Sequence, residues 1–317
     1  MKFSFASTKA PRPHALTARL KAIGVIAALA LGLAACANGN RYATKSDARP
    51  HPGVAAAHRL PIHGVDVSKW QGKIDWASVS GAGTQFAFIK ATEGGDHADE
   101  RFLENWHGTK QAGIPRAAYH FMFWCRPADE QAAWFRSTVP NDPDALPPVL
   151  DLEWNAQSRT CPHRLPREEA LAMIKVMLHE MEAHTGKRPI IYTDITFHRD
   201  VLEGELSHYP HWVRSVAAEP HERYPNRPWL LWQYTAAGRV PGIQTEVDLN
   251  AFYGGRAEWA RFLASSCDPR FAAQGACNGQ NTSAAAQDTP ESWPKAAFDR
   301  LRPSPDQRAH LENADQG

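Results

Sequence analysis

The sequence lacks the side-chain patterns that mark several large functional classes. Its five cysteines in 317 residues stand at spacings that match no zinc-ligand pattern, and it contains neither a Gly-x-Ser-x-Gly elbow nor a glycine-rich phosphate loop. His179 and His184 would lie about 140° apart around a helix rather than on one face. We therefore expect no metal site and no cofactor.

A cluster of basic residues is also missing. The chain contains 35 Lys and Arg and 34 Asp and Glu, but the first 35 residues contain five Lys and Arg and no acidic residue. Without that segment, 30 basic residues (35 − 5) remain against 34 acidic ones, a net charge of −4. A mildly acidic chain offers little attraction to phosphate backbones, so we expect no nucleic-acid partner.

One apolar run, residues 22–33, follows the basic start of the chain and is too short to span a bilayer comfortably. It ends in Leu33-Ala34-Ala35-Cys36, which resembles the lipobox of bacterial lipoproteins. We expect residues 1–35 to be a signal peptide, and Cys36 to become a lipid-carrying N-terminus. The exported protein would be anchored to a membrane, by expectation the outer membrane, and face the periplasm. The alternative is an ordinary secretory signal with a chance cysteine.

Four further cysteines remain: Cys125, Cys161, Cys267 and Cys277. An even number in an exported protein indicates disulfides, and three pairings are possible. We favour Cys125–Cys161 because both residues follow consecutive expected strands. We favour Cys267–Cys277 because these two flank a short polar loop.

The two ends of the chain differ from its middle. Residues 36–60 are rich in Ala, Pro, Asn and Arg without periodicity, which predicts a flexible tether. From residue 265 to residue 317, Ser, Asp, Gln, Asn and Pro dominate, and we expect a polar, largely disordered tail. The segment between them, residues 61–264, is the expected catalytic domain.

Short apolar segments alternate with helical patterns through this middle segment. The expected strands are 64–68, 86–92, 116–122, 147–154, 189–193, 211–215, 229–234 and 247–250. Such alternation implies right-handed crossovers and mostly parallel strands. Eight strands predict an α/β fold, a TIM-like β/α barrel, irregular in its second half where the helices are short or absent.

The stretch from Pro147 to Trp154 is the strongest candidate for chemistry. Side chains alternate along a strand, so Asp151 and Glu153 share one face while Leu150 and Leu152 share the other. Placing two carboxylates side by side raises the pKa of one, which lets one remain an acid while its partner is ionised. Hydrolysis of a glycosidic bond needs this division of roles. A structural ion-pair site or a metal-binding edge is the alternative.

Polar and aromatic residues recur where the other expected strands end. Active sites of β/α barrels lie at the carboxyl ends of the strands, so these residues should share one rim. The candidates for binding substrate are Asp66, Glu93, Tyr119, Tyr192, Gln233 and Asp248. Four tryptophans near the same rim can stack on sugar rings, and we expect no more than two of them to do so: Trp70, Trp124, Trp154 and Trp232.

These motifs resemble those of the glycoside hydrolase family 25 lysozymes (muramidases). The matching segments, in family order, are Gly64-Val65-Asp66-Val67-Ser68, Phe88-Ile89-Lys90-Ala91-Thr92-Glu93-Gly94, Ala118-Tyr119-His120-Phe121, Asp151-Leu152-Glu153, Ile191-Tyr192-Thr193, Trp232-Gln233-Tyr234 and Val247-Asp248-Leu249-Asn250. The resemblance covers residues 60–263. One departure is Trp212-Val213-Arg214-Ser215, where the family often has Trp-x-Ala.

The resemblance implies a flattened barrel that hydrolyses the β-1,4 bond between N-acetylmuramic acid and N-acetylglucosamine in peptidoglycan. It implies that Glu153 is the general acid and that Asp66 and Asp248 surround the sugar at the cleavage site. Asp151 would either stabilise an oxazolinium formed by the substrate's N-acetyl group or activate water. We expect a monomer.

Two other functions stay open at this point. One is hydrolysis of a chitin-like N-acetylglucosamine polymer, which shares the N-acetyl group with peptidoglycan. The other is a cell-wall-binding lipoprotein without catalysis, against which the intact set of four carboxylates argues.

Overall fold

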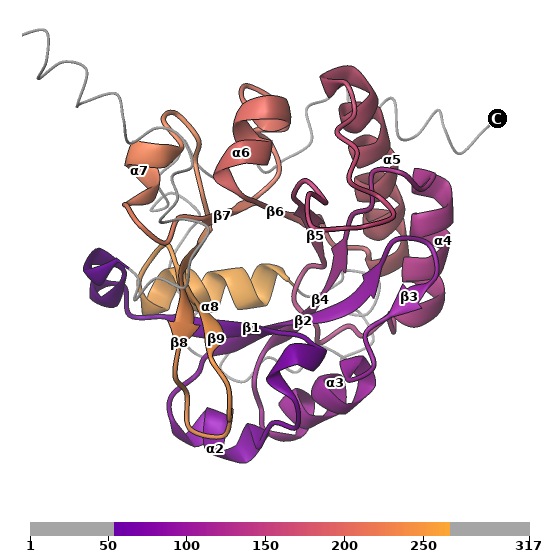
Figure 1. Cartoon of the computed structure of the whole chain (residues 1–317). Coiled ribbons are helices and arrows are strands. Elements are labelled where there is room, and N and C mark those ends of the chain that lie inside the picture. Colours follow the sequence, from indigo (N-terminus) through magenta and orange to yellow (C-terminus); the bar gives the residue numbers. More distant parts are fainter. Residues whose placement is uncertain (1–53, 267–317) are drawn as a thin grey trace, which may run out of the picture. The chain divides into compact units, whose positions relative to one another are not determined.

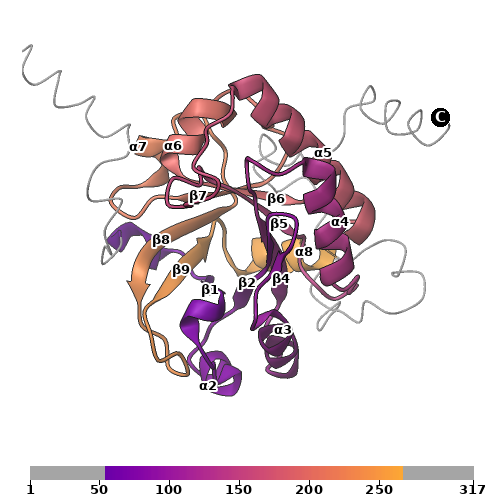
Figure 2. The ribbon, with the colours of Figure 1, turned by 45° about the vertical axis from the view of Figure 1, so that its right-hand side comes forward.

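Eight strands close into a barrel in the computed structural model, which describes residues 54–266 (Figures 1 and 2). The pairing order is β1-β9-β8-β7-β6-β5-β4-β2, and β2 pairs with β1 to complete the ring. The barrel strands are β1 (His63–Val67), β2 (Phe86–Glu93), β4 (Arg116–Phe121), β5 (Val149–Leu152), β6 (Ile190–Thr193), β7 (His211–Arg214), β8 (Leu231–Gly238) and β9 (Val247–Phe252). A short strand, β3 (His97–Ala98), pairs with β2 outside the ring. The predicted α/β barrel is confirmed.

Strand β9 runs against its neighbours. Six of the eight pairings in the ring are parallel, whereas β9 pairs antiparallel with both β8 and β1. No helix separates β8 from β9, so the chain returns directly as a hairpin. The irregular second half that the sequence predicts is therefore an antiparallel closure.

Helices cover most of the outside of the barrel (Figure 2). They are α2 (Trp76–Gly81), α3 (Phe102–Gln111), α4 (Ala128–Thr138), α5 (Arg167–Thr185), α6 (Ile195–Phe197), α7 (Pro220–Arg223) and α8 (Arg256–Ser265), with the short turns η2 (Ala55–Arg59), η3 (Lys69–Gln71) and η4 (His198–Leu202). Asp75 caps α2 by accepting from the backbone N–H groups of Ala77 and Ser78. Gly186 ends α5 with a φ of 69°. Within residues 54–266, no helix is both long and apolar enough to cross a bilayer.

The hydrophobic core has an inner and an outer part. Inside the barrel, Phe86 and Phe252 pack against Trp259 and Phe262 of α8. Since Phe86 begins β2, α8 closes the end of the barrel where the parallel strands start. Outside, α2 to α5 bury their apolar faces against the strands. With one end filled, a ligand can enter at the other.

The segment before β1 packs on the barrel instead of hanging free. Ala57 in η2 is fully buried and lies in a cluster with Trp232, Tyr234 and Ala251. It covers the β8–β9 side (Figures 1 and 2). The flexible tether predicted for residues 36–60 is therefore wrong for residues 54–60. Among the described residues, no α-helix covers the apolar outer side chains of the β8–β9 hairpin, and residues 54–60 bury them instead. Residues 36–53 lie outside the described part.

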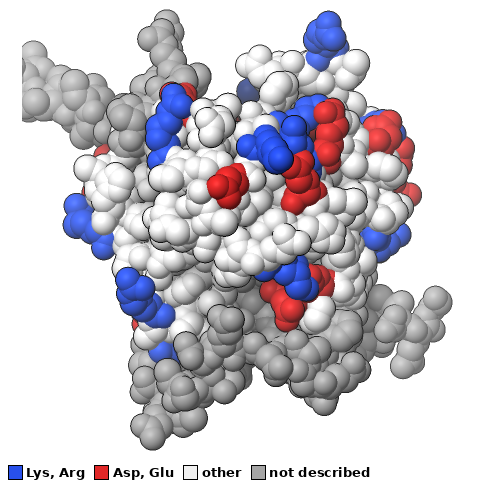
Figure 3. All heavy atoms as spheres, turned by 90° about the horizontal axis from the view of Figure 1, so that it is seen from below, with Lys and Arg blue, Asp and Glu red and all other residues white. Residues whose placement is uncertain are grey.

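Charges of both signs are mixed on the face shown in Figure 3. Lys and Arg side chains lie beside Asp and Glu there, separated by uncharged surface. Over the described residues of this face, no single sign covers a continuous area.

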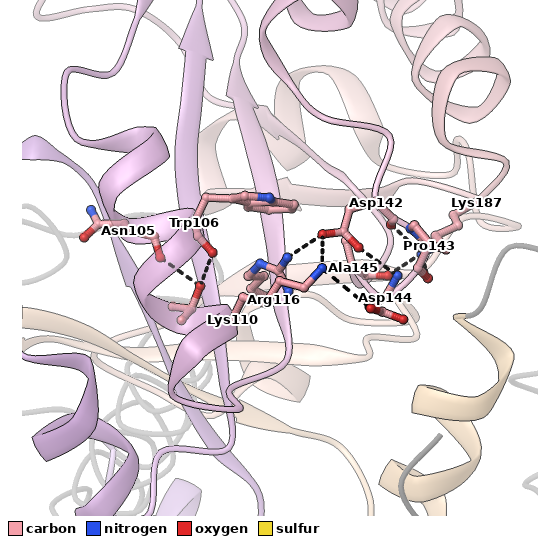
Figure 4. A network of polar contacts seen from close by, with 10 residues as sticks. Asn105, Trp106, Lys110, Arg116, Asp142, Pro143, Asp144, Ala145 and Lys187 are labelled. Atoms are coloured by element: carbon pink, nitrogen blue, oxygen red, sulfur yellow. Dashed lines mark hydrogen bonds and ion pairs between the residues drawn. The ribbon is translucent and has the colours of Figure 1, made fainter. Parts of the chain in front are cut away.

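A polar network below the barrel fixes the loop that leads into β5 (Figure 4). The buried Lys187 donates from Nζ to the backbone oxygens of Asp142 (3.4 Å), Pro143 (2.8 Å) and Ala145. From the other side, Arg116 forms an ion pair with the Asp142 carboxylate at 2.5 Å. The loop is therefore held by the first residue of β4 and by a residue between α5 and β6, and it leads directly into β5.

We predict that Lys187→Met lowers the free energy of unfolding by about 1–3 kcal/mol, because buried carbonyl oxygens lose their donor. Urea denaturation measures this. The control is Lys110→Met, which removes an ion pair to Asp142 from a side chain that is 52% exposed and should cost about 0–1 kcal/mol. Equal losses in the two variants would contradict the role given to Lys187.

Candidate active site

A cavity of about 300 Å³ lies at the rim where the parallel strands end. Seven of the eight catalytic and substrate-binding residues predicted from the sequence line it: Asp66, Tyr119, Asp151, Glu153, Tyr192, Gln233 and Asp248. Six of them lie on six different strands, and Glu153 directly follows β5, the strand that carries Asp151. The barrel topology thus brings together side chains that are up to about 180 residues apart in the sequence.

The eighth predicted residue, Glu93, does not line the cavity. It forms an ion pair with Lys90, which does line it and whose ammonium lies 4.9 Å from the centre of the Phe121 ring. Glu93 therefore reaches the cavity only through its partner.

A chain of hydrogen bonds ends at Asp66. Asp66 Oδ2 accepts from Asn250 Nδ2 (2.7 Å) and from Gln233 Nε2 (3.0 Å). Gln233 Oε1 accepts from the Tyr192 hydroxyl (2.9 Å), and Asn250 Oδ1 accepts from Trp212 Nε1 (2.8 Å). In both branches, Tyr192–Gln233 and Trp212–Asn250, each hydrogen bond is donated in the direction of the Asp66 carboxylate. The network therefore favours the ionised form of Asp66, although burial raises its pKa to about 6.

Asp248 faces Asp66 across the β1–β9 pairing. The sequence places Asp248 at a strand end, but it lies near the start of β9; it reaches the same rim because β9 is antiparallel. Burial and the charge of Asp66 raise the pKa of Asp248 to about 8. Two opposed carboxylates repel each other, so Asp248 keeps its proton when Asp66 is ionised.

Asp151 lies at the centre of β5 with its side chain buried. Burial, and then the charge of Glu153, raise its pKa well above the ordinary value. Among the described residues, its Oδ1 atom has no hydrogen-bond partner. A buried polar atom left unpaired costs free energy, so this oxygen is suited to accept from a donor on a bound molecule.

Glu153 follows β5 directly, and its backbone oxygen accepts from Trp124 Nε1 at 2.6 Å. Burial, and then the charge of Asp194, raise the pKa of Glu153 to about 7, while Arg214 opposes that increase. The Tyr192 hydroxyl also reaches Glu153. Its hydrogen bond lowers the pKa of Glu153, so Tyr192, like Arg214, favours the ionised form and limits the increase that burial causes.

The cavity also contains residues that the sequence analysis did not select: Lys90, Phe121, Trp212 and Arg214, with Asn250 behind Asp66. Strand alternation was the available signal for three of these five. Trp212 and Arg214 share one face of β7, and Asn250 shares a face with Asp248. Arg214 had been noted only as a departure from Trp-x-Ala.

The four rim tryptophans have different surroundings. Trp70 is 76% exposed and lines the cavity, so its ring is open to a ligand. Trp124 and Trp232 are buried, and Trp154 is half-buried with its Nε1 donating to Asp200 at 3.0 Å. Of the four, Trp70 fits a sugar platform.

The predicted disulfide between Cys125 and Cys161 is confirmed, with a Cα–Cα distance of 5.6 Å. It joins the loop after β4 to the loop after β5 and encloses Asp151 and Glu153 in the closed segment. Cys36, Cys267 and Cys277 lie outside the described residues, so their predicted roles stay predictions.

The arrangement can perform general acid chemistry. A carboxyl group whose pKa lies near neutrality stands beside a second carboxyl group that can hold charge or accept a hydrogen bond. Among residues 54–266, no group of three or more His, Cys, Asp and Glu side chains is arranged to hold a metal ion.

The family model described as "Glycosyl hydrolases family 25" matches residues 65–243 of the chain. The chain is similar to Lysozyme M1 of Streptomyces globisporus, with 36% identity over 67% of this chain and 73% of that protein. It is also similar to "Uncharacterized protein YegX" of Escherichia coli (strain K12), with 37% identity over 65% of this chain and 76% of that one. The structure of a family 25 glycosyl hydrolase from Bacillus anthracis superposes with a TM-score of 0.60 and 34% identity, covering 67% of this chain and 96% of that one.

We predict that removing the disulfide lowers both stability and cleavage of polymeric substrate. Closing a loop between residues 36 apart contributes about 4 kcal/mol in the chain-entropy model. Cys125→Ser should therefore melt at a lower temperature than the unsubstituted protein, and reductant should lower the melting temperature of the variant less than that of the unsubstituted protein. A variant with unchanged melting temperature and turnover would contradict this role.

Proposed function

The chain belongs to the glycosyl hydrolases family 25, and from this membership we propose that it is a lysozyme that cuts the β-1,4 bond between N-acetylmuramic acid and N-acetylglucosamine in peptidoglycan. It is an enzyme, a glycoside hydrolase. One observation carries the proposal: Glu153 stands beside Asp151 in the cavity with its pKa raised to about 7.

Glu153 acts as the general acid in this proposal. It donates its proton to the glycosidic oxygen as the bond to the sugar breaks, so that the leaving sugar departs as a neutral alcohol. Burial and the negative charge of Asp194 keep this proton in place near neutral pH. Tyr192 forms a hydrogen bond with Glu153 that favours the carboxylate, and so it stabilises the group once the proton has been donated.

Asp151 supports the substrate's own N-acetyl group. Its unpaired Oδ1 accepts from the acetamido N–H, which orients the acetamido oxygen for attack on the anomeric carbon. The attack forms an oxazolinium as the leaving sugar departs. Water then adds to the anomeric carbon and loses a proton to the Glu153 carboxylate, which restores both the N-acetyl group and the acid.

Other residues of the cavity bind the sugars. Asp66 is held by Gln233 and Asn250 and offers a charged acceptor for sugar hydroxyl groups. Trp70 offers an exposed ring at the rim on which an apolar sugar face can stack.

We predict that Glu153→Gln lowers turnover of purified peptidoglycan by about 10²- to 10⁴-fold without loss of fold, because the amide keeps the shape and loses the proton. Mass spectrometry of the digest identifies the bond that is cut. The unsubstituted enzyme should release fragments with a new N-acetylmuramic acid reducing end.

Glu168→Gln, at an exposed position in the first turn of α5, is the matched control and should keep full activity. Near-normal turnover by Glu153→Gln would remove this residue from the role of acid. A new N-acetylglucosamine reducing end would contradict the proposed bond.

We predict that activity falls as the pH rises through about 7, because the general acid must carry its proton. Asp194→Asn removes a charge that raises the pKa of Glu153, so the alkaline midpoint of kcat/KM should move to lower pH. The Asn oxygen can still accept from the Phe197 N–H, which Asp194 caps at 2.7 Å.

The control for this shift is Asp129→Asn, in the first turn of α4. It should leave the midpoint in place. An Asp194→Asn enzyme with an unchanged midpoint would show that this charge does not set the acid's pKa.

We propose further that the protein is exported, carries lipid on Cys36 and faces the periplasm from the outer membrane; the lipobox-like sequence supports this. Cys36→Ser should move the protein to the soluble fraction or leave it unprocessed. Equal incorporation of labelled palmitate into the variant and the unsubstituted protein would overturn the lipid site.

A further inference from the structure

Arg214 occupies a fixed position on the wall of the cavity. It is the last residue of β7 and pairs with Gln233 of β8 in the sheet. Its backbone oxygen accepts from the Tyr224 hydroxyl at 2.6 Å, and its side chain lines the cavity. Two residues of the cavity wall are cations, and the other is Lys90 on β2. Strands β2 and β7 are four places apart in either direction around the ring, so the two cations stand on opposite sides.

Lys90 and Arg214 differ in where their acidic neighbours lie. Lys90 is paired with Glu93, which stands outside the cavity wall. Arg214 instead faces Glu153, Tyr192 and Asp248, all of which line the cavity. A guanidinium has five N–H donors in a planar fork, so it can serve these neighbours and a bound anion together.

The proposed chemistry does not itself require a cation here. Breaking a glycosidic bond develops positive charge on the sugar, and a guanidinium beside that sugar opposes it. Besides lowering the pKa of Glu153, Arg214 can therefore contribute to binding. Its neighbours carry only part of their negative charge near neutral pH, because burial raises the pKa of Glu153 to about 7 and that of Asp248 to about 8.

We propose that Arg214 binds a carboxylate of the glycan, namely the free lactyl carboxylate of N-acetylmuramic acid residues that have lost their peptide stems. The inference rests on the proposed function. A carboxylate matches the planar fork with two parallel hydrogen bonds, whereas the lactyl carbonyl of a peptide-bearing sugar is a neutral amide. The preferred substrate is then a bare glycan strand, so a reaction that hydrolyses the amide bond between lactyl group and peptide must come first.

Three glycan preparations test this with the full-length enzyme: bare strands, the same strands with their lactyl carboxylates converted to amides, and strands that carry peptides. The unsubstituted enzyme should show a kcat/KM on bare strands about 10- to 100-fold above that on amidated strands, the range of a charge-assisted hydrogen bond. In Arg214→Gln this ratio should fall to about one. Arg239→Gln, whose side chain is 68% exposed, should keep the ratio of the unsubstituted enzyme.

Two results would overturn the inference. Equal rates of the unsubstituted enzyme on bare and amidated strands would show that no lactyl carboxylate is recognised, and this comparison does not depend on the folding of any variant. An Arg214→Gln enzyme that loses activity on all three preparations but keeps the ratio would assign Arg214 to the balance of charge in the cavity. Failure of the unsubstituted enzyme to cut any preparation would instead overturn the proposed function, and this inference with it.

Discussion

The site depends on the crowding of four carboxyl groups into one small cavity. Little water reaches these buried carboxyl groups, so they cannot all be ionised together. The neighbouring charges and hydrogen-bond donors of the protein decide which of them ionise. Asp66 receives two amide N–H groups and is held as a carboxylate. Asp248 opposes it and keeps a proton, and burial with the charge of Asp194 raises the pKa of Glu153 to about 7. The barrel thus separates acids from carboxylates by burial and neighbouring charge at Glu153 and Asp248, and by hydrogen bonds at Asp66.

The rest of the fold keeps these groups in place. Below the barrel, Lys187 and Arg116 hold the loop that enters β5, and α8 fills the opening at that end. Above it, the Cys125–Cys161 disulfide ties the loops that follow β4 and β5. The strand that carries Asp151 is only four residues long, so it needs support at both ends.

Much of the barrel and of its cavity could be predicted from the sequence, because the alternation of side chains and the positions of strand ends indicate which side chains reach the rim. Asp151, Tyr192 and Gln233 were found in that way. The direction of β9 could not be predicted, since its alternation is the same in a parallel and an antiparallel strand. The packing of residues 54–60 follows from that direction, because the hairpin leaves a side of the barrel without a helix.

Arg214 and Asn250 could not be assigned to the cavity from the sequence, for a different reason. Each shares a strand face with a residue of the cavity, but a polar residue on a strand end is equally compatible with a surface position. Their partners come from other strands, about 20 to 180 residues away in sequence, so only the folded ring reveals them.

The most direct test of the account is the protonation state of Glu153 in the resting enzyme. A ¹³C NMR titration of glutamate side-chain carboxyl carbons, with the Glu153 signal assigned by its loss in Glu153→Gln, measures its midpoint without substrate. The account predicts a midpoint near 7, well above the ordinary value of 4.5. A midpoint at or below 4.5 would mean that Glu153 is ionised at neutral pH, and it would contradict the claim that this cavity holds a catalytic proton.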